Sequence, residues 1–214
     1  MITIGLTGSI GMGKSTAAAM LRRMGLPVYD ADAAVHALLA PDGAAVRPVE
    51  ALFPGTRNEA GGIDRKRLGS FVFADTAALR RLEAVLHPLV RAREQRFRAA
   101  LLRRGAPLTV LDIPLLYESG GDRRCDAVLV VTAPAFLQRQ RVLARPGMTE
   151  EKFRDILARQ MPDREKRWRT RYVIATGLGR RHTWLALRRC LRQIAGEARP
   201  TSRRVHEIRH LRRH

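Results

Sequence analysis

The sequence predicts an α/β fold, with a parallel sheet and helices on both of its faces. Three observations predict it. Short, almost continuously apolar runs recur along the chain, as expected of strands buried on both faces. Helical patterns separate these runs, and strands that alternate with helices form parallel sheets. The length of 214 residues suits one such domain with a smaller insertion.

The first quarter of the chain gives two strands and two helices. Residues 2–7, ITIGLT, form a buried strand, and the helix from Lys14 stops at Gly25. A second strand covers 26–32 and ends in acids, and a short helix follows it up to Pro41.

The next section predicts a surface connection and then a long helical region. Residues 41–64 are rich in turn formers. From Asp64 to Arg104 the pattern is helical, with a break at His87-Pro88, because proline has no N–H to donate and its ring clashes with the preceding turn.

The second half repeats the alternation. Residues 107–114 and 125–133 are buried strands joined by a loop, and 171–176 is the last strand. Helices are expected from Pro134, from Thr149 and over 181–196. The basic tail 199–214 is expected to be disordered. In such sheets, ligands bind at the carboxyl ends of the strands.

Composition bounds the class of protein. No apolar run is long enough for a membrane helix, the start lacks the features of a signal peptide, and two distant cysteines give no disulfide framework or metal spacing. We therefore expect a cytoplasmic protein that is a monomer or a small homo-oligomer and has no membrane partner. The net charge of +20 comes mainly from arginine and favours anionic ligands; aromatic residues, at 5%, are too few to favour nucleic acid.

The stretch GSIGMGKS fits the phosphate-binding loop pattern in full and lies between a predicted strand and a predicted helix. Its glycines let backbone N–H groups point at phosphate oxygens, and the helix N-terminus adds further donors. Lys14 is expected at the β- and γ-phosphates, Ser15 at Mg²⁺ and Thr16 at the α-phosphate. The motif predicts a nucleoside triphosphate site, with ATP the favoured ligand. Its binding residues are Gly8, Gly11, Met12, Gly13, Lys14, Ser15 and Thr16.

Two acids end the second strand, beside the expected γ-phosphate. Asp30 and Asp32 lie one residue apart, so only one is expected to orient an acceptor hydroxyl and take its proton. The residues alone favour Asp30 for this role or for Mg²⁺-bound water; alternatively, both acids cap the next helix. Asp112 closes a strand in the same way and is a candidate for Mg²⁺ through water, or else for a strand cap.

Across nearly its whole length the chain resembles the dephospho-CoA kinase family. The segments that carry the resemblance are IGLTGSIGMGKST, VYDADAAVHALLAP, RKRLGSFVFADTAALRRLEAVLHPLV, VLDIPLLYE and QRQRVLARPGMTEEKFRDILARQMP. The resemblance implies a P-loop core (1–40, 105–135 and 168–198), a helical CoA-binding insertion over about 41–104 and a lid over about 138–167. It implies transfer of the ATP γ-phosphoryl group to the ribose 3′-hydroxyl of dephospho-CoA, the last step of CoA synthesis.

The resemblance also assigns residues. It implies that Asp32 is the general base. It matches both Arg141 and Arg145 to the lid arginines that stabilise the transferring phosphoryl group, and the spacing from Gln138 favours Arg141. The residues that it places at the acceptor are Asp32, His87, Leu115, Leu116 and Glu118. The chain departs from the family pattern over 170–177, where an expected Asp and Asn are missing, although Gly177-Leu178-Gly179 still predicts a turn near the base.

Two alternatives remain. The chain could be a P-loop kinase for another small metabolite or nucleoside, which the identity of the acceptor would reveal. It could instead be an NTPase stimulated by nucleic acid, in keeping with its charge.

Overall fold

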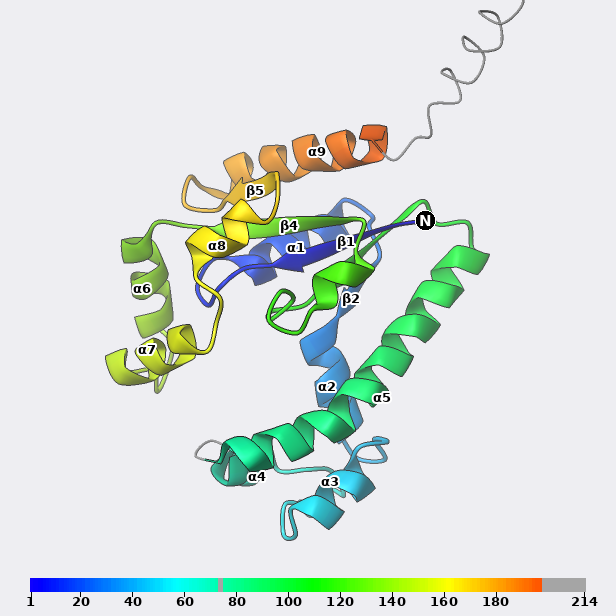
Figure 1. Cartoon of the computed structure of the whole chain (residues 1–214), viewed down its shortest axis with the longest axis vertical. Coiled ribbons are helices and arrows are strands. Elements are labelled where there is room, and N and C mark those ends of the chain that lie inside the picture. Colours follow the sequence, from blue (N-terminus) through cyan, green and yellow to red (C-terminus); the bar gives the residue numbers. More distant parts are fainter. Residues whose placement is uncertain (73–74, 198–214) are drawn as a thin grey trace, which may run out of the picture. The chain divides into compact units, whose positions relative to one another are not determined.

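The computed structural model describes residues 1–72 and 75–197 and has the expected α/β architecture (Figure 1). Its strands are β1 (Ile2–Thr7), β2 (Val28–Asp30), β3 (Leu108–Asp112), β4 (Ala127–Thr132) and β5 (Tyr172–Ala175). They form one sheet in the order β2-β3-β1-β4-β5, and the pairs β2/β3, β1/β4 and β4/β5 are parallel. The predicted fold class is confirmed. The strand expected over 26–32 is shorter, because α2 begins at Ala31.

The chain divides into two compact units. One contains Pro27–Ile113, and the other contains Ile2–Leu26 together with the chain from Pro114 onward. Strands β2 and β3 therefore belong to the same unit as the expected insertion, and the nucleotide loop belongs to the other.

The first unit carries four helices. They are α2 (Ala31–Leu39), α3 (Val46–Leu52), α4 (Arg65–Val72) and α5 (Thr76–Arg103). Their apolar faces make a core of their own, which includes Leu38, Val49, Phe53, Leu68 and Leu82. Helices α2, α3 and α4 each pack on α5, which therefore organises this unit.

Two expectations for this unit are wrong. The connection 41–64 contains a helix, α3, whose Pro48 lies in the first turn, where the missing N–H of proline would have no partner. The expected break at His87-Pro88 does not occur, since Pro88 lies inside α5, which is 28 residues long. Leu82 and Leu86, in the first half of α5, are buried in the core. After the proline, the Val90 carbonyl accepts a 3.0 Å hydrogen bond from the Tyr29 hydroxyl. These contacts before and after Pro88 offset the backbone hydrogen bond that the proline cannot make.

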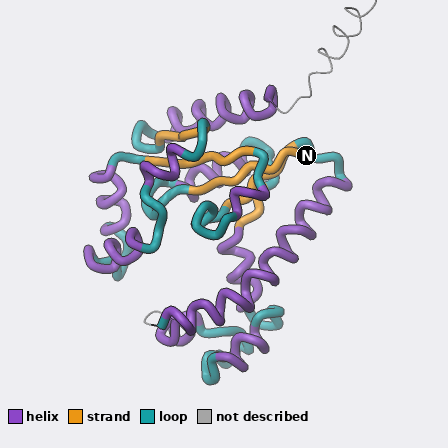
Figure 2. The backbone as a smooth tube through the Cα atoms, in the orientation of Figure 1, coloured by secondary structure: helices purple, strands orange, loops and turns teal. Residues whose placement is uncertain are grey.

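The second unit is built on β1, β4 and β5. Its helices are α1 (Lys14–Arg23), α6 (Ala135–Leu143), α7 (Glu150–Ala158), α8 (Asp163–Trp168) and α9 (Arg180–Glu197), with a 3₁₀ turn at Gly121–Arg124. Helix α1 contacts α9 and α8 contacts β4 (Figure 2). Five of the six β1 residues are buried, as expected of a strand covered on both faces.

Two further features bear on the expectations. Helix α8 was not expected from the sequence, and the predicted disordered tail 199–214 lies outside the described residues. No helix of the described chain combines the length and the apolar character needed to cross a membrane.

Candidate active site

The loop 8–15 leaves the carboxyl end of β1 and opens α1. Gly11 and Gly13 have φ angles of 76° and 86°, in the left-handed region that favours glycine. A Cβ on Gly11 would lie 2.9 Å from the main-chain oxygen of Gln138, and a Cβ on Gly13 would lie 2.9 Å from Thr176 Oγ1. The loop thus needs glycine at both positions for its conformation and for its close packing on α6 and the end of β5.

The first turn of α1 is open to a ligand. Gly13 is the N-cap residue, and no side chain caps this helix within the described chain. The N–H groups of the first turn can therefore donate to an anion. Lys14 is half-buried, and Ser15 and Thr16 are exposed on this turn. A backbone cup with a cation and two hydroxyl groups at its rim can hold a phosphate chain.

Arg141 of α6 is bonded to the back of this loop. Its Nη1 donates to the Gly11 carbonyl at 3.3 Å and to Thr176 Oγ1 at 3.1 Å, and its Nη2 donates to the Thr176 carbonyl at 3.0 Å. These bonds use three of the five N–H donors of a guanidinium.

Thr176 holds the loop as well. Its hydroxyl donates to the Met12 carbonyl at 2.8 Å, and the buried Met12 sulfur accepts from the Ala133 N–H at 3.0 Å. The departure from the family pattern over 170–177 therefore supplies a loop contact at Thr176. Met12 can offer the nucleotide only its backbone, because its side chain is in the core.

The two acids after β2 have different surroundings. Asp30 is the N-cap of α2, and its carboxylate accepts the Ala33 N–H at 2.9 Å. Asp32 lies in the first turn of α2 and is exposed. Asp30 makes the capping bond and is half-buried, whereas Asp32 is exposed.

Asp112 and His87 also belong to the unit that carries Asp32. Asp112 ends β3, is only 3% exposed and pairs in register with Asp30, so two acids meet at this edge of the sheet. His87 is exposed on α5.

The loop after β3 presents only part of the expected acceptor set. Leu115 is 41% exposed, whereas Leu116 is fully buried and would meet a Cβ placed on Gly5. Leu116 is a core residue, so any substrate contact would be through its backbone. The Thr7 hydroxyl bonds the Pro114 carbonyl at 2.8 Å and fixes the start of this loop.

Glu118 faces protein groups. Its Oε1 accepts the Met161 N–H at 2.8 Å and lies 2.8 Å from Nζ of Lys166, whose side chain is fully buried. The contact with Lys166 is an ion pair without hydrogen-bond geometry. Glu118 therefore joins the loop after β3 to the chain between α7 and α8.

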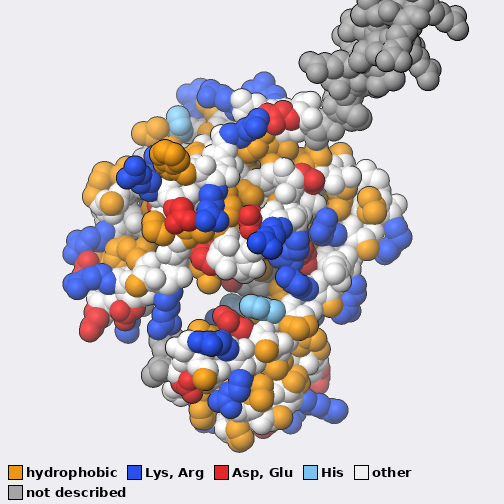
Figure 3. Space-filling view, viewed as in Figure 1, with side chains coloured by type: hydrophobic (Ala, Val, Ile, Leu, Met, Phe, Trp, Pro, Cys, Tyr) orange, Lys and Arg blue, Asp and Glu red, His pale blue; other side chains and the backbone are white. Residues whose placement is uncertain are grey.

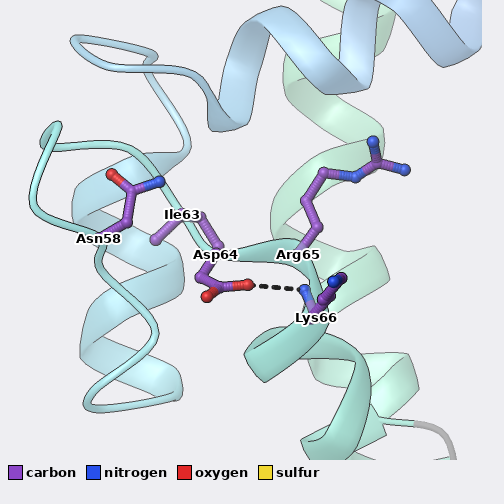
Figure 4. Close-up of a pocket in the computed structure, with 5 residues that line it drawn as sticks. All are labelled: Asn58, Ile63, Asp64, Arg65 and Lys66. Carbon is purple, nitrogen blue, oxygen red and sulfur yellow. Dashed lines mark hydrogen bonds between the residues drawn. The ribbon is translucent and has the colours of Figure 1, made fainter.

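A pocket lies at the start of α4. Its lining residues are Asn58, Ile63, Asp64, Arg65 and Lys66 (Figure 4). The Asp64 carboxylate accepts the N–H groups of Lys66 and Arg67, and these bonds lower its pKa below the ordinary value. The side chains of Arg65 and Lys66 extend away from Asp64 and offer two cations to an anionic ligand.

The comparison with protein families decides the assignment. The family model of dephospho-CoA kinase matches residues 2–178. The chain belongs to the dephospho-CoA kinase family. The match includes the nucleotide loop, both acids after β2, His87 and the loop after β3.

Comparisons with individual proteins agree with this assignment. The chain is 62% identical over 167 residues to the dephospho-CoA kinase of Paramagnetospirillum magneticum, covering 78% of each chain. It is similar to the crystal structure of TT1252 from Thermus thermophilus, with a TM-score of 0.76, 38% identity and coverage of 92% and 97% of the two chains. Dephospho-CoA kinase from Campylobacter jejuni has the same fold, with a TM-score of 0.62, 23% identity and coverage of 90% and 96%.

The oxygen donors of this chain fit a Mg²⁺ ion that is held largely by phosphate and water. Among residues 1–72 and 75–197 no group of three His, Cys, Asp or Glu side chains could cage a metal ion. Mg²⁺ in nucleotide sites takes one or two protein oxygens and completes its shell with phosphate and water. The Ser15 hydroxyl and the Asp112 carboxylate are oxygen donors of the required kind.

Sequence reasoning missed several residues that build the site of this family member. Thr176 stood out only as a departure from the family pattern, and Gln160 only as part of a matching segment. Lys166 gave no signal, because a lysine between two other charged residues reads as exposed, whereas it is fully buried.

Proposed function

We propose that the chain transfers the γ-phosphoryl group of ATP to the ribose 3′-hydroxyl of dephospho-CoA, which yields CoA and ADP. The observation that carries the proposal is the nucleotide loop, with left-handed Gly11 and Gly13 and an uncapped α1, in a chain that matches this family over residues 2–178. The loop supplies the nucleotide site, and membership in the family supplies the acceptor.

Each role follows from chemistry. The N–H groups of α1 and the Lys14 ammonium bind the phosphate chain and stabilise charge as it moves toward the β-phosphate. The Asp32 carboxylate orients the 3′-hydroxyl and accepts its proton while the new O–P bond forms and the bond between the β- and γ-phosphates breaks. The two N–H donors of Arg141 that bond neither Gly11 nor Thr176 are proposed to reach the phosphoryl oxygens when the nucleotide binds. Ser15 is proposed to hold Mg²⁺ directly and Asp112 to hold it through water, and the ion would screen the negative charge of the triphosphate.

The helical unit is proposed to hold the rest of the acceptor. Arg65 and Lys66 line the pocket at the start of α4 and can pair with acidic groups of dephospho-CoA. His87 on α5 is a further candidate contact in this unit. The exposed Leu115, which belongs to the other unit, is another candidate contact. We place the reaction in the cytoplasm, in keeping with Cys125 and Cys190, which form no disulfide within the described residues.

Acceptor dependence tests the proposal. The purified chain is supplied with ATP and Mg²⁺, and ADP release is followed by a coupled assay with dephospho-CoA, a nucleoside, gluconate, shikimate, DNA or RNA. ADP release is expected only with dephospho-CoA. Release driven by another small acceptor would identify a different kinase, and release stimulated by DNA or RNA would identify a nucleic-acid-dependent NTPase; either result refutes the proposal.

A further inference from the structure

Two glutamines bond the backbone of one residue in the nucleotide loop. Gln138 Nε2 donates to the Ile10 carbonyl at 2.7 Å, and Gln160 Oε1 accepts the Ile10 N–H at 3.0 Å. Gln138 lies in α6 and is only 7% exposed, whereas Gln160 follows α7. A residue within α6 and a residue after α7 are thus both hydrogen-bonded to Ile10 of the loop.

The direction of the two bonds is fixed by the backbone. A carbonyl only accepts and an N–H only donates, so Gln138 must act as a donor and Gln160 as an acceptor. A substitution by glutamate removes the donor that Gln138 provides but keeps the acceptor that Gln160 provides. The same change is therefore expected to break the hydrogen bond at position 138 and to keep the one at position 160.

Three successive carbonyls of the nucleotide loop accept hydrogen bonds from side chains. The carbonyls of Ile10, Gly11 and Met12 accept from Gln138, Arg141 and Thr176, respectively. In a trans peptide unit the carbonyl and the following N–H point in opposite directions. Donors bonded to the carbonyls of Ile10 and Met12 therefore turn the N–H groups of Gly11 and Gly13 to the other side, the orientation that a phosphate cup needs.

We infer that Gln138 and Gln160 are positioning residues that hold the nucleotide loop in its phosphate-binding conformation through Ile10. They touch neither nucleotide nor acceptor and act only through the loop backbone. The inference deepens the proposed function and rests on its nucleotide site, but it does not depend on the identity of the acceptor.

Glutamate substitutions at the two positions test it. The dissociation constant for ATP is measured without acceptor, by calorimetry, for Gln138→Glu and Gln160→Glu. Both variants add the same charge beside the same loop residue. Gln138→Glu is expected to bind ATP at least about tenfold more weakly than Gln160→Glu, because only the former loses its hydrogen bond and sets a carboxylate against a carbonyl. Equal affinities would overturn the inference.

Three controls sharpen the result. Gln140→Glu changes an exposed glutamine of α6 and should bind ATP nearly as the unmodified chain does. The dissociation constant for dephospho-CoA should stay within about twofold in every variant, since a general loss of structure would change it too. If thermal unfolding shows that Gln138→Glu does not fold, Gln138→Met replaces it and should weaken ATP binding about tenfold; unchanged binding there would overturn the inference.

The outcome also separates the two proposals. If the unmodified chain binds ATP and the two glutamate variants do not differ, only the role of the glutamines fails. If the unmodified chain binds no ATP, the proposed function and this inference fail together.

Discussion

At the scale of single residues, the pair of acids after β2 shows how two similar side chains can have different functions. Asp30 caps α2 by accepting the Ala33 N–H, whereas Asp32, two residues later in the first turn of α2, is exposed. The sequence predicted that only one acid would act on the acceptor. Spacing alone favoured Asp30, and the family resemblance favoured Asp32. The capping bond supports Asp32.

Asparagine substitutions separate these functions. Asp32→Asn is expected to lower kcat about 10²–10⁴-fold with ATP affinity retained, because the general base is lost. Asp30→Asn is the matched control; asparagine caps helices as well as aspartate does, so kcat should stay within a few-fold. Steady-state kinetics with varied dephospho-CoA checks both. A large loss of kcat in Asp30→Asn with normal turnover in Asp32→Asn would reverse the assignment.

Residue identity was predictable where a motif dictates it. Lys14 and Ser15 follow from the loop pattern, because phosphate binding requires those groups at that spacing. The tethers from Gln160 and Thr176 were not predictable, since they join residues 150 and 164 positions apart in the chain. The fully buried Lys166 contradicts the usual exposure of lysine and needs its partner Glu118 to be understood.

At the scale of elements, the ion pair between Glu118 and Lys166 connects the loop after β3 with α8. Met161, next to Gln160, donates to the same carboxylate. Residues 160 and 161 therefore contact both the nucleotide loop and the loop after β3, and they join two parts of the proposed site.

Breaking this pair should be costly. Glu118→Gln leaves the fully buried Lys166 ammonium uncompensated and is expected to lower the free energy of unfolding by about 3–5 kcal/mol. Adding Lys166→Met should restore most of the loss, because it removes the buried charge. Arg139→Ala breaks the exposed pair with Glu150 and should cost under about 1 kcal/mol. Urea unfolding measures all three, and equal losses for the buried and the exposed pair would contradict this account.

Pro88 within α5 allows a second prediction for an element. Pro88→Ala restores an N–H donor to an otherwise continuous helix and is expected to raise the free energy of unfolding by about 1–3 kcal/mol. If the proline shapes the acceptor surface beside His87, KM for dephospho-CoA rises while ATP affinity stays constant. Thermal unfolding and steady-state kinetics check both effects. A loss of stability would show that α5 needs the proline for its packing.

The elements that were wrongly predicted share a physical cause. The strands and the long helices have a hydrophobic periodicity that the sequence shows. Helices α3 and α8 are short and have a proline at or near their start, and proline usually indicates a turn. The continuity of α5 depends on packing from Tyr29 and the helical core, which local pattern does not reveal.

At the scale of the whole molecule, the net charge of +20 acts on substrates that are both polyanions. On the face drawn in Figure 3, lysine and arginine side chains are spread out rather than gathered in one stripe. This distribution fits a general field that attracts small anions better than it fits a track for a nucleic-acid backbone.

Ionic strength tests this view. Raising the salt concentration from about 0.05 M to about 0.3 M shortens the screening length and should raise KM for ATP and dephospho-CoA several-fold, with kcat little changed. Initial rates over a salt series measure this. A fall in kcat at constant KM would mean that salt acts on the chemical step or on the structure.

The position of the transferred phosphate tests the central claim most directly. The chain is incubated with ATP, Mg²⁺ and dephospho-CoA, and the product is analysed by mass spectrometry and phosphorus NMR. The account predicts one ADP for each product molecule, with a single new phosphate on the ribose 3′-oxygen. ADP formed without a phosphorylated acceptor, or a phosphate at any other position, would contradict it.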